Sequence, residues 1–461
     1  SRRLNFRVGG ENISKINNFR IIGQGIKVLH FSFKIFGVFM LDLNYLKGGK
    51  LEKLKSSLVN RGYSLDILEK VLEVDERRRK LIKEVDDLRA RKNEKSKIIS
   101  QMRIKGESVD ELLKEAKEID NVLEKLEQER KKIENEFNYY WSLIPNIPHE
   151  SVPIGKDSSD NLVVREWGRI PEFDFEPKPH WEICEKLDII DFNMGGELAG
   201  SRFVVYKGLG AELEWALINY FREFAKKHGY KEIIPPFLVN ERVMFNSGQL
   251  PKFKDEMYYI EKDELYLVPT AEVPLTSLFM DRTLDEEELP IYYFAYTPCF
   301  RREAGAYGKD VRGIKRMHQF NKVELYKFTL PENSYEEHEK MVRDVEEILQ
   351  SLNIPYRVVL LCTGDMGFAS AKTYDIEVYC AGQGGYLEAS SISNVEDFQS
   401  RRANIKVKRK NGKKEFIHTL NGSGLATPRV LISIIENNQT REGYVVIPEP
   451  LRKYLGVDII K

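Results

Sequence analysis

The sequence predicts an α+β protein in which a long helical hairpin precedes a mixed domain. Residues 67–102 and 112–144 repeat apolar side chains every three or four positions, which is the pattern of a coiled-coil seam. From about residue 170 onwards, strand-like apolar segments alternate with amphipathic helical ones. The chain has 461 residues, which is enough for two or three domains with a large core.

A short turn joins the two helical stretches. Gly106 is followed by Ser108-Val109-Asp110-Glu111, and this S-x-x-E sequence predicts a capping box that starts the second helix. Because the turn is short, the two long helices must run antiparallel. Arg78, Lys92 and Lys95 interrupt the apolar seam, and acids accompany the bases on the outward faces. By themselves these charges indicate a solvated helix face.

A proline-containing segment ends the hairpin. Ile144-Pro145-Asn146-Ile147-Pro148 cannot continue a helix, because proline lacks the amide hydrogen and restricts the residue before it. We therefore expect an N-terminal domain over residues 40–145, a linker over 146–170 and a second domain over 171–461. In the second domain, residues 213–228 predict an amphipathic helix.

Composition limits the classes of partner and compartment. Lys+Arg and Asp+Glu are both 72, so net charge gives no indication of a nucleic-acid partner and any basic surface must be local. The four cysteines show no CxxC or Cys/His spacing, so we expect no disulfide framework, no structural zinc and a reducing, cytoplasmic location. The apolar residues 28–39 are too few and too charged to cross a bilayer, and no membrane partner is expected.

The densest cluster of chemically useful residues lies on a predicted β-hairpin. Residues 291–296 and 323–328 read as its strands, and a loop rich in glycine and charge lies between them at 305–313. Residues 300–305 read Phe-Arg-Arg-Glu-Ala-Gly, and residues 316–324 add another arginine, an aromatic and a second acid. Arginine grips phosphate oxygens in bidentate fashion, and an aromatic ring offers a face to a purine. Arg-Arg-Glu alone would indicate only a solvated basic loop.

Three further stretches carry polar side chains at the ends of predicted elements. Residues 267–272 end an apolar strand with Thr-x-Glu, which by itself indicates a helix N-cap. Residues 385–394 place an acid and several serines on a strand, either to hold a hard cation through oxygen ligands or as a polar edge strand. Residues 420–429 read as a Gly-rich turn that feeds a helix over 430–439 and permits close backbone approach to a ligand.

In combination these stretches resemble the class II aminoacyl-tRNA synthetases, in the form used by bacterial-type seryl-tRNA synthetase. Residues 300–324 resemble motif 2 almost residue for residue, and residues 420–429 resemble motif 3. The predicted strand over 231–239, stopped or edged by its prolines, resembles motif 1 around Pro236, the least specific of the three. The resemblance runs from Met40 to the C-terminus. It implies a catalytic domain on an antiparallel sheet flanked by helices, plus an N-terminal antiparallel two-helix coiled-coil arm.

The resemblance also implies a reaction and a set of site residues. The expected enzyme activates L-serine with ATP and transfers it to tRNA(Ser), and to tRNA(Sec) where the host has that tRNA. Arg301 and Arg429 are the expected catalytic residues. The implied ATP site comprises Arg301, Arg302, Glu303, Arg316, Phe320, Glu388, Ala389, Ser390, Ser391 and Arg429. The implied serine site comprises Thr270, Ala271, Glu272, Arg301, Glu324 and Ser423. Glu388 and Ser391 are expected to hold Mg²⁺, and no zinc is expected.

The resemblance implies a homodimer whose helical arm binds tRNA through a basic face, with no base-specific motif. Two other classes share parts of this pattern. A paralogue that charges a carrier protein would lack the arm, and a non-enzymatic relative kept for RNA binding or as a scaffold would have lost site residues. Activity on tRNA(Ser), measured with and without the hairpin, separates the three.

Residues 1–39 differ from the rest of the chain. They carry seven Lys and Arg residues against the single acid Glu11. Such a basic, acid-poor segment is typical of an organelle transit peptide. Alternatively it is translated sequence upstream of Met40, because Met40-Leu41-Asp42-Leu43 resembles the start of the family. We prefer the second interpretation and expect residues 1–39 to lie outside the fold.

Overall fold

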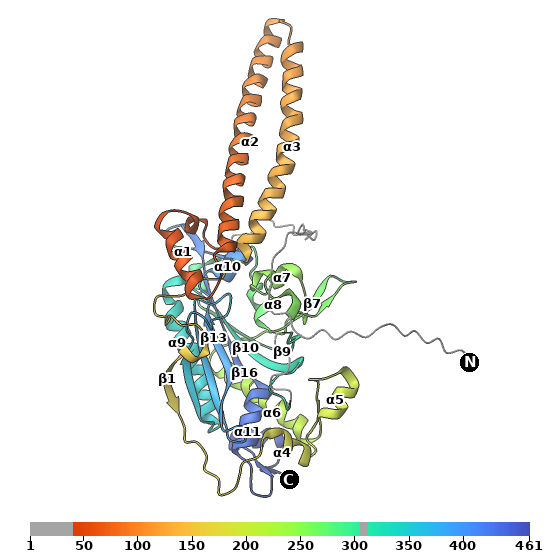
Figure 1. Ribbon diagram of the computed structural model, residues 1–461, viewed down its shortest axis with the longest axis vertical. Helices are drawn as coiled ribbons and strands as arrows, with labels where there is room; N and C mark the ends of the chain where they lie inside the picture. The colour runs from red at the N-terminus through yellow and green to blue at the C-terminus, as the bar shows by residue number, and fades with distance from the viewer. Residues whose placement is uncertain (1–39, 305–311) are drawn as a thin grey trace, which may run out of the picture. The chain divides into compact units, whose positions relative to one another are not determined.

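The computed structural model describes residues 40–304 and 312–461 (Figure 1). The interpretations of residues 1–39, and most of the loop predicted at 305–313, therefore concern residues outside the described ranges. Within those ranges, no helix is both long enough and apolar enough to cross a membrane.

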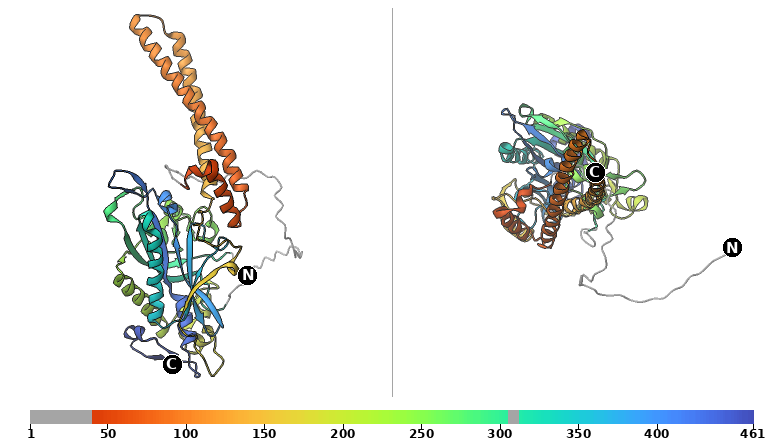
Figure 2. Two further views of the ribbon diagram at one scale, coloured as in Figure 1. Left: turned by 90° about the vertical axis from the view of Figure 1, so that its left-hand side faces the viewer. Right: turned by 90° about the horizontal axis from the view of Figure 1, so that it is seen from above.

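Two long antiparallel helices follow a short helical segment. The segment consists of the 3-10 helix η1 (Leu43–Leu46) and α1 (Gly48–Asn60), and the hairpin consists of α2 (Asp66–Lys105) and α3 (Asp110–Ser142). α2 and α3 lie side by side in every view (Figures 1 and 2). At 1.5 Å per residue, α2 is about 60 Å long. The predicted hairpin is confirmed.

Ion pairs between the helices fill the polar part of the seam. Lys92 pairs with Asp120 at 2.5 Å, and Lys95 pairs with Glu115. Arg78 lies 4.5 Å from the centroid of the Phe137 ring. The charges that interrupt the apolar repeat therefore join α2 to α3. Each exposed pair contributes only about 0–1 kcal/mol, so the pairs fix the register of the hairpin more than they stabilise it.

The predicted capping box at the start of the second helix is wrong. α3 begins at Asp110 with Val109 as its N-cap residue, which makes no side-chain capping bond. The Ser108 hydroxyl instead donates to the Asp110 carboxylate at 3.1 Å. The turn depends on Gly106, which adopts the left-handed conformation at the end of α2 and returns its amide to α2 carbonyls.

An eight-stranded sheet forms the centre of the second part. Its strand order is β1-β11-β12-β13-β16-β10-β9-β4, and every neighbouring pair is antiparallel except β4 with β9. The strands are β1 (Leu162–Trp167), β4 (Lys231–Glu232), β9 (Ile291–Phe300), β10 (Gln319–Thr329), β11 (Tyr356–Leu360), β12 (Lys372–Cys380), β13 (Gly385–Asn394) and β16 (His418–Ala426). The α+β class and the hairpin of β9 and β10 are confirmed.

Helices cover one face of this sheet with the main apolar core. These are α6 (Leu209–Lys227), α9 (Ser334–Ser351), α11 (Thr427–Asn437) and α12 (Glu449–Leu455). Their buried residues pack against strand residues such as Leu325, Ile376 and Ile392. Because side chains alternate along a strand, the intervening residues point to the other face, where the polar site residues lie.

Shorter elements complete the chain. The remaining helices are α4 (His180–Lys186), α5 (Phe192–Ala199), α7 (Glu241–Asn246), α8 (Glu272–Thr276), α10 (Phe398–Ala403), and the 3-10 turns η2 (Ser158–Asp160), η3 (Lys254–Glu256), η4 (Glu286–Glu288) and η5 (Pro331–Asn333). Small sheets contain β2 (Ile190–Asp191) with β3 (Val205–Tyr206), β5 (Leu238–Asn240) with β6 (Tyr259–Ile260) and β7 (Leu265–Leu267), β8 (Thr283–Asp285) with β14 (Lys406–Lys408) and β15 (Lys414–Phe416), and β17 (Val445–Val446) with β18 (Ile459–Ile460).

Two sequence predictions about secondary structure are wrong. The stretch from Leu420 to Leu425 is part of the interior strand β16 and not a turn. Its glycines make room for the core, since a Cβ on Gly424 would lie 2.9 Å from Leu325 and one on Gly422 would lie 3.0 Å from Met341. The strand predicted over 231–239 is split into β4 and β5, because the proline pair between them cannot pair in a sheet.

Candidate active site

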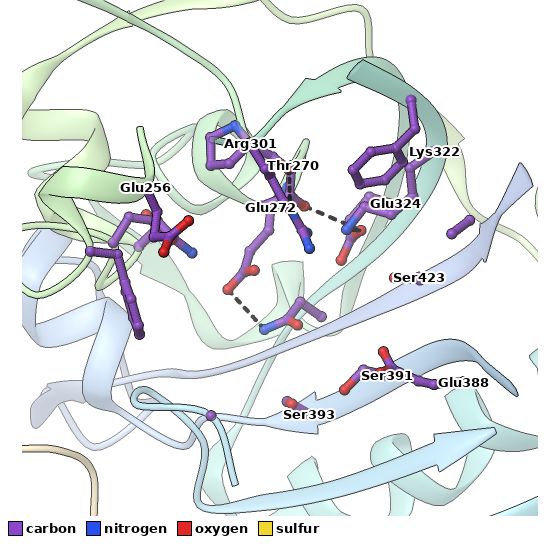
Figure 3. Close-up of a pocket in the computed structure, with 18 of the residues that line it drawn as sticks. Glu256, Thr270, Glu272, Arg301, Lys322, Glu324, Glu388, Ser391, Ser393 and Ser423 are labelled. Atoms are coloured by element: carbon purple, nitrogen blue, oxygen red, sulfur yellow. Dashed lines mark hydrogen bonds and ion pairs between the residues drawn. The ribbon is translucent and has the colours of Figure 1, made fainter. Parts of the chain in front are cut away.

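A pocket of about 670 Å³ opens on the polar face of the sheet. Residues of β10, β13 and β16 line it, together with α8, the segment that follows β9 and the start of α11. Figure 3 shows side chains of these elements pointing into a common space. Twelve of the residues expected in the site line this pocket: Thr270, Glu272, Arg301, Glu303, Arg316, Phe320, Glu324, Glu388, Ala389, Ser391, Ser423 and Arg429.

Three expected residues do not line the pocket. Arg302 is exposed, and its guanidinium lies 5.4 Å from the centroid of the Tyr258 ring. Ala271 is fully buried in an apolar cluster. Ser390 is also buried, and its hydroxyl donates to the Ser423 carbonyl oxygen at 2.5 Å. Ser390 therefore joins β13 to β16 behind the pocket wall.

Strand periodicity positions the side chains of β10. Phe320, Lys322 and Glu324 are two residues apart, so they share the face that lines the pocket. The two charged residues are almost fully buried, and Lys322 Nζ forms an ion pair with Glu324 Oε2. A buried charge that keeps a partner avoids most of the cost of leaving water.

Carboxylates and hydrogen-bond acceptors gather at one end of the pocket. Thr270 Oγ1 accepts the Glu272 amide at 3.2 Å, but the N-cap residue of α8 is Ala271, so Thr270 is not the predicted helix cap. The same hydroxyl lies 3.4 Å from Glu324 Oε2. The Glu272 side chain accepts from Gln399 at 2.7 Å and from Asn421 at 3.1 Å. Figure 3 shows Glu272 and Glu324 entering this end from different elements.

This crowding changes the acidity of Glu272. Burial, and after it the nearby negative charge of Glu324, raise the pKa of Glu272 to about 7 against the opposing charge of Lys322. A cation bound between the two carboxylates would favour ionisation. This end of the pocket is therefore suited to a ligand with a positively charged amine.

Two arginines also reach the pocket, and Arg301 lies near enough to Glu272 to oppose the rise in its pKa. Arg301 Nε donates to the Pro269 carbonyl oxygen at 3.3 Å, and the Arg301 guanidinium lies 5.1 Å from the centroid of the Phe320 ring. Arg429 donates to the Lys315 and Glu388 carbonyl oxygens, both at 2.9 Å. Because both guanidiniums reach the pocket from backbone anchors, their remaining donors can meet an anionic ligand.

Glu303 and Arg316 lie across the motif 2 loop from each other. The Arg316 guanidinium is 3.3 Å from Glu303 Oε2. Glu303 has a φ of +50°, which is rare for a residue with a side chain and costs about 1–3 kcal/mol. Its backbone strain directs the carboxylate towards Arg316 at the pocket edge.

A β-bulge in β13 brings the Glu388 carboxylate and the Ser391 hydroxyl to the same face of the sheet. Residues three apart on a regular strand point to opposite faces. Here β12 pairs Ile376 with Ser390 but Glu377 with Glu388, so Ala389 is the extra residue. Glu388 and Ser391 therefore both face the pocket. Since β13 is an interior strand, the alternative of a polar edge strand is wrong.

Asp375 adds a second carboxylate near this bulge. It is the cross-strand partner of Ser391, and its Oδ1 atom is buried without a hydrogen-bond partner among the described residues. Burial raises the pKa of Asp375 well above its usual range, and the charge of Glu388 adds to the effect. A bound cation would relieve this repulsion, so the donor set fits a hard divalent ion.

Sequence reasoning missed several residues of the pocket. Lys322 and Asn421 share strand faces with Glu324 and Ser423, so the period of two could have identified them. Gln399 and Glu256 come from separate segments and carry no such signal. Glu256 accepts the Ala304 amide at 3.0 Å and so holds the first residues of the motif 2 loop.

Within residues 40–304 and 312–461, no group of three or more His, Cys, Asp or Glu side chains is placed to hold a metal ion by itself. All four cysteines are buried free thiols.

Known proteins resemble this chain over most of its length. Residues 40–148 match the family model of the seryl-tRNA synthetase N-terminal domain. Residues 253–438 match that of the tRNA synthetase class II core domain (G, H, P, S and T). Serine–tRNA ligase of Caldicellulosiruptor bescii is 54% identical over 92% of this chain and 100% of its own length. The ligase of Thermodesulfovibrio yellowstonii is 51% identical, with the same shares covered.

Solved structures of seryl-tRNA synthetases also resemble this chain. Seryl-tRNA synthetase from Pyrococcus horikoshii, complexed with ATP, matches 91% of this chain and 99% of its own with a TM-score of 0.85 and 38% identity. Cytoplasmic serine–tRNA ligase from Naegleria fowleri, in complex with AMP, matches 92% of this chain and 99% of its own with a TM-score of 0.80 and 32% identity. The fold is that of a class II aminoacyl-tRNA synthetase. Within that class, the chain belongs to the seryl-tRNA synthetase family and is an aminoacyl-tRNA ligase.

Proposed function

We propose that this enzyme activates L-serine with ATP and then transfers the seryl group to tRNA(Ser). The observation that carries the proposal is that one pocket holds both a pair of carboxylates, Glu272 and Glu324, and two arginines, Arg301 and Arg429. The carboxylates suit the ammonium group of an amino acid, and the arginines suit a triphosphate.

The first step needs little proton transfer. The serine carboxylate is already ionised at neutral pH, and one of its oxygens attacks the α-phosphorus of ATP. The new bond to phosphorus forms as the bond to the pyrophosphate oxygen breaks, which gives seryl-adenylate and pyrophosphate. Arg301 steadies the carboxylate and the α-phosphoryl group, and Arg429 bears charge on the leaving pyrophosphate. A ribose hydroxyl of the terminal nucleotide of tRNA then attacks the seryl carbonyl, and AMP leaves.

Glu388 and Ser391 would hold Mg²⁺ near Arg429, with Asp375 across from Ser391 on β12. The ion, when bound, neutralises phosphate charge during phosphoryl transfer. The bulge at Ala389 supports this assignment, because it places both oxygen-bearing side chains on one face. Phe320 remains the residue proposed to stack on the adenine.

Selection of serine follows from hydrogen bonding to its hydroxyl. Glu324 is buried beside Thr270, and Ser423 lines the same pocket on the neighbouring strand. Alanine would leave these polar groups unpaired, which costs far more than a lost methylene contact. Threonine would be excluded by its extra methyl group.

We also propose the domain order expected from the sequence, with a tRNA-binding arm in residues 40–145 and the catalytic domain in 171–461. A homodimer is supported by apolar side chains exposed on α6 and beside β4 and β5: Trp215 (55%), Ile234 (82%), Phe237 (37%) and Leu238 (42%). tRNA(Sec) would be a second substrate in a host that has it.

ATP–pyrophosphate exchange, measured with serine, threonine, alanine and glycine, tests the activation step. We expect exchange with serine alone, followed by charging when tRNA(Ser) is added. Exchange without charging would favour the paralogue that loads a carrier protein. A folded protein without exchange would favour the non-enzymatic relative.

A further inference from the structure

A buried histidine and a buried glutamate lie outside the pocket lining. His180 begins α4 and Glu436 lies near the end of α11, and their side chains are 1% and 0% exposed. His180 Nδ1 lies 2.8 Å from Glu436 Oε1, and the His180 backbone amide donates to the same oxygen at 3.0 Å. The reaction proposed above uses neither residue.

The second ring nitrogen of His180 contacts the chain that returns from the motif 2 loop. His180 Nε2 lies 3.1 Å from the backbone nitrogen of Ile314. An amide can only donate, so Nε2 accepts and the ring proton lies on Nδ1, where it donates to Glu436. The carboxylate thereby orients the ring so that it presents an acceptor to Ile314.

Gly313 permits this close contact. A Cβ at position 313 would lie 2.0 Å from His180 Nε2, and the φ of Gly313 is +78°. Both the space and the left-handed backbone therefore require glycine beside the ring.

α11 holds the returning segment at two consecutive residues. Arg429, in the first turn of α11, donates to the Lys315 carbonyl oxygen at 2.9 Å. Glu436, near the other end of the helix, acts on Ile314 through His180. The next residue, Arg316, lines the pocket.

Further hydrogen bonds hold the pair itself. The Gln383 amide donates to Glu436 Oε2 at 3.1 Å. Gln439 accepts the Lys178 amide at 2.8 Å and donates to the Lys178 carbonyl oxygen at 3.0 Å. The chain leading into α4 is thus fixed to the end of α11. Satisfied polar contacts in such a buried region specify a single arrangement of the backbone.

We propose that His180 and Glu436 are positioning residues that hold Ile314 to Arg316 where Arg316 meets ATP. The proposal rests on the proposed activation of serine by ATP, and neither residue touches a substrate. Loss of the acceptor at Nε2 frees the Ile314 amide, so the ATP end of the pocket loses its preformed shape. The serine end depends on α8 and β10 and keeps its own contacts.

Two amide variants of His180 test this inference. The glutamine amide reaches the position of Nε2 and can accept from Ile314, whereas the asparagine amide reaches only the position of Nδ1. We expect H180N to raise KM for ATP in pyrophosphate exchange at least about tenfold, and H180Q to stay within about threefold of the wild type. KM for serine should change by less than about threefold in both variants. Hydrogen exchange over residues 312–318 should accelerate in H180N only.

Equal KM values for ATP in the two variants would overturn the proposal, as would wild-type exchange over residues 312–318 in H180N. If H180N does not fold, H180M replaces it, because methionine has the length of glutamine and no strong acceptor. If the wild-type enzyme shows no pyrophosphate exchange, the proposed function fails, and the hydrogen-exchange comparison still tests the positioning role.

Discussion

At the residue scale, the recognition of serine proposed above depends on the ionisation of Glu272. Its pKa of about 7 in the free enzyme means that acid protonates the group before other carboxylates of ordinary acidity. Serine binding by its ammonium needs the ionised form. We therefore expect kcat/KM for serine to fall about tenfold from pH 8 to pH 6, because kcat/KM reports the free enzyme.

The measurement is pyrophosphate exchange at subsaturating serine across that pH range. In E272Q the rate should be lower at every pH. The fall in kcat/KM below about pH 7, which is the acidic limb of the pH profile, should be absent. An acidic limb that persists in E272Q would show that another group causes it.

Lys322 should affect the pH at which this acidic limb occurs. Its charge opposes the rise in the pKa of Glu272, so K322M should move the limb to higher pH. The matched control is K327M, which removes a buried lysine of the same strand that pairs with Glu337 at 2.8 Å outside the pocket. We expect both variants to lower the melting temperature, because each removes the buried lysine partner of a glutamate. A shift of the limb with K327M, or none with K322M, would contradict this coupling.

At the element scale, the sequence predicted the segments with a strong and local pattern. The hairpin helices, α6, and the pair β9 and β10 have long runs of one period, and all are present. β16 was not predicted, because Gly422 and Gly424 are typical of a turn. They fit a strand only because Met341 and Leu325 pack against them, and the local sequence does not reveal those contacts.

The sequence also could not predict the register in which strands and helices pair. The bulge at Ala389 decides that Glu388 and Ser391 share a face, yet it exists only in the pairing of β13 with β12. The pairing of Lys92 with Asp120 likewise depends on how α2 lies along α3. The same applies to His180 and Glu436, which are 256 residues apart in the chain.

The arm should contribute to charging and not to activation. Arg79, Lys83 and Lys97 are exposed and share one face of α2 by helical spacing. Reversal of the three charges should raise KM for tRNA(Ser) at least about tenfold, since phosphate contacts dominate affinity for a nucleic acid. Pyrophosphate exchange should be unchanged.

The matched control reverses three exposed lysines of α3, Lys125, Lys131 and Lys132, and should have a smaller effect. Equal effects of the two triple variants would place the tRNA on both helices.

At the scale of the whole molecule, the exposed apolar side chains near β4 connect assembly to catalysis. β4 pairs with β9 at Tyr293 and Phe294, and β9 runs on to Arg301 at the pocket. A partner that covers Ile234 would therefore support the strand that leads into Arg301, the proposed catalytic residue.

The double variant I234D/L238D should be monomeric at micromolar concentration in sedimentation velocity, because a carboxylate buried in an interface is strongly disfavoured. Its pyrophosphate exchange should fall with the dimer fraction and recover as protein concentration rises. The control I154D changes a residue that is 72% exposed elsewhere and should remain dimeric. A monomer with full exchange activity would show that β9 needs no partner and that the pocket of one chain is complete.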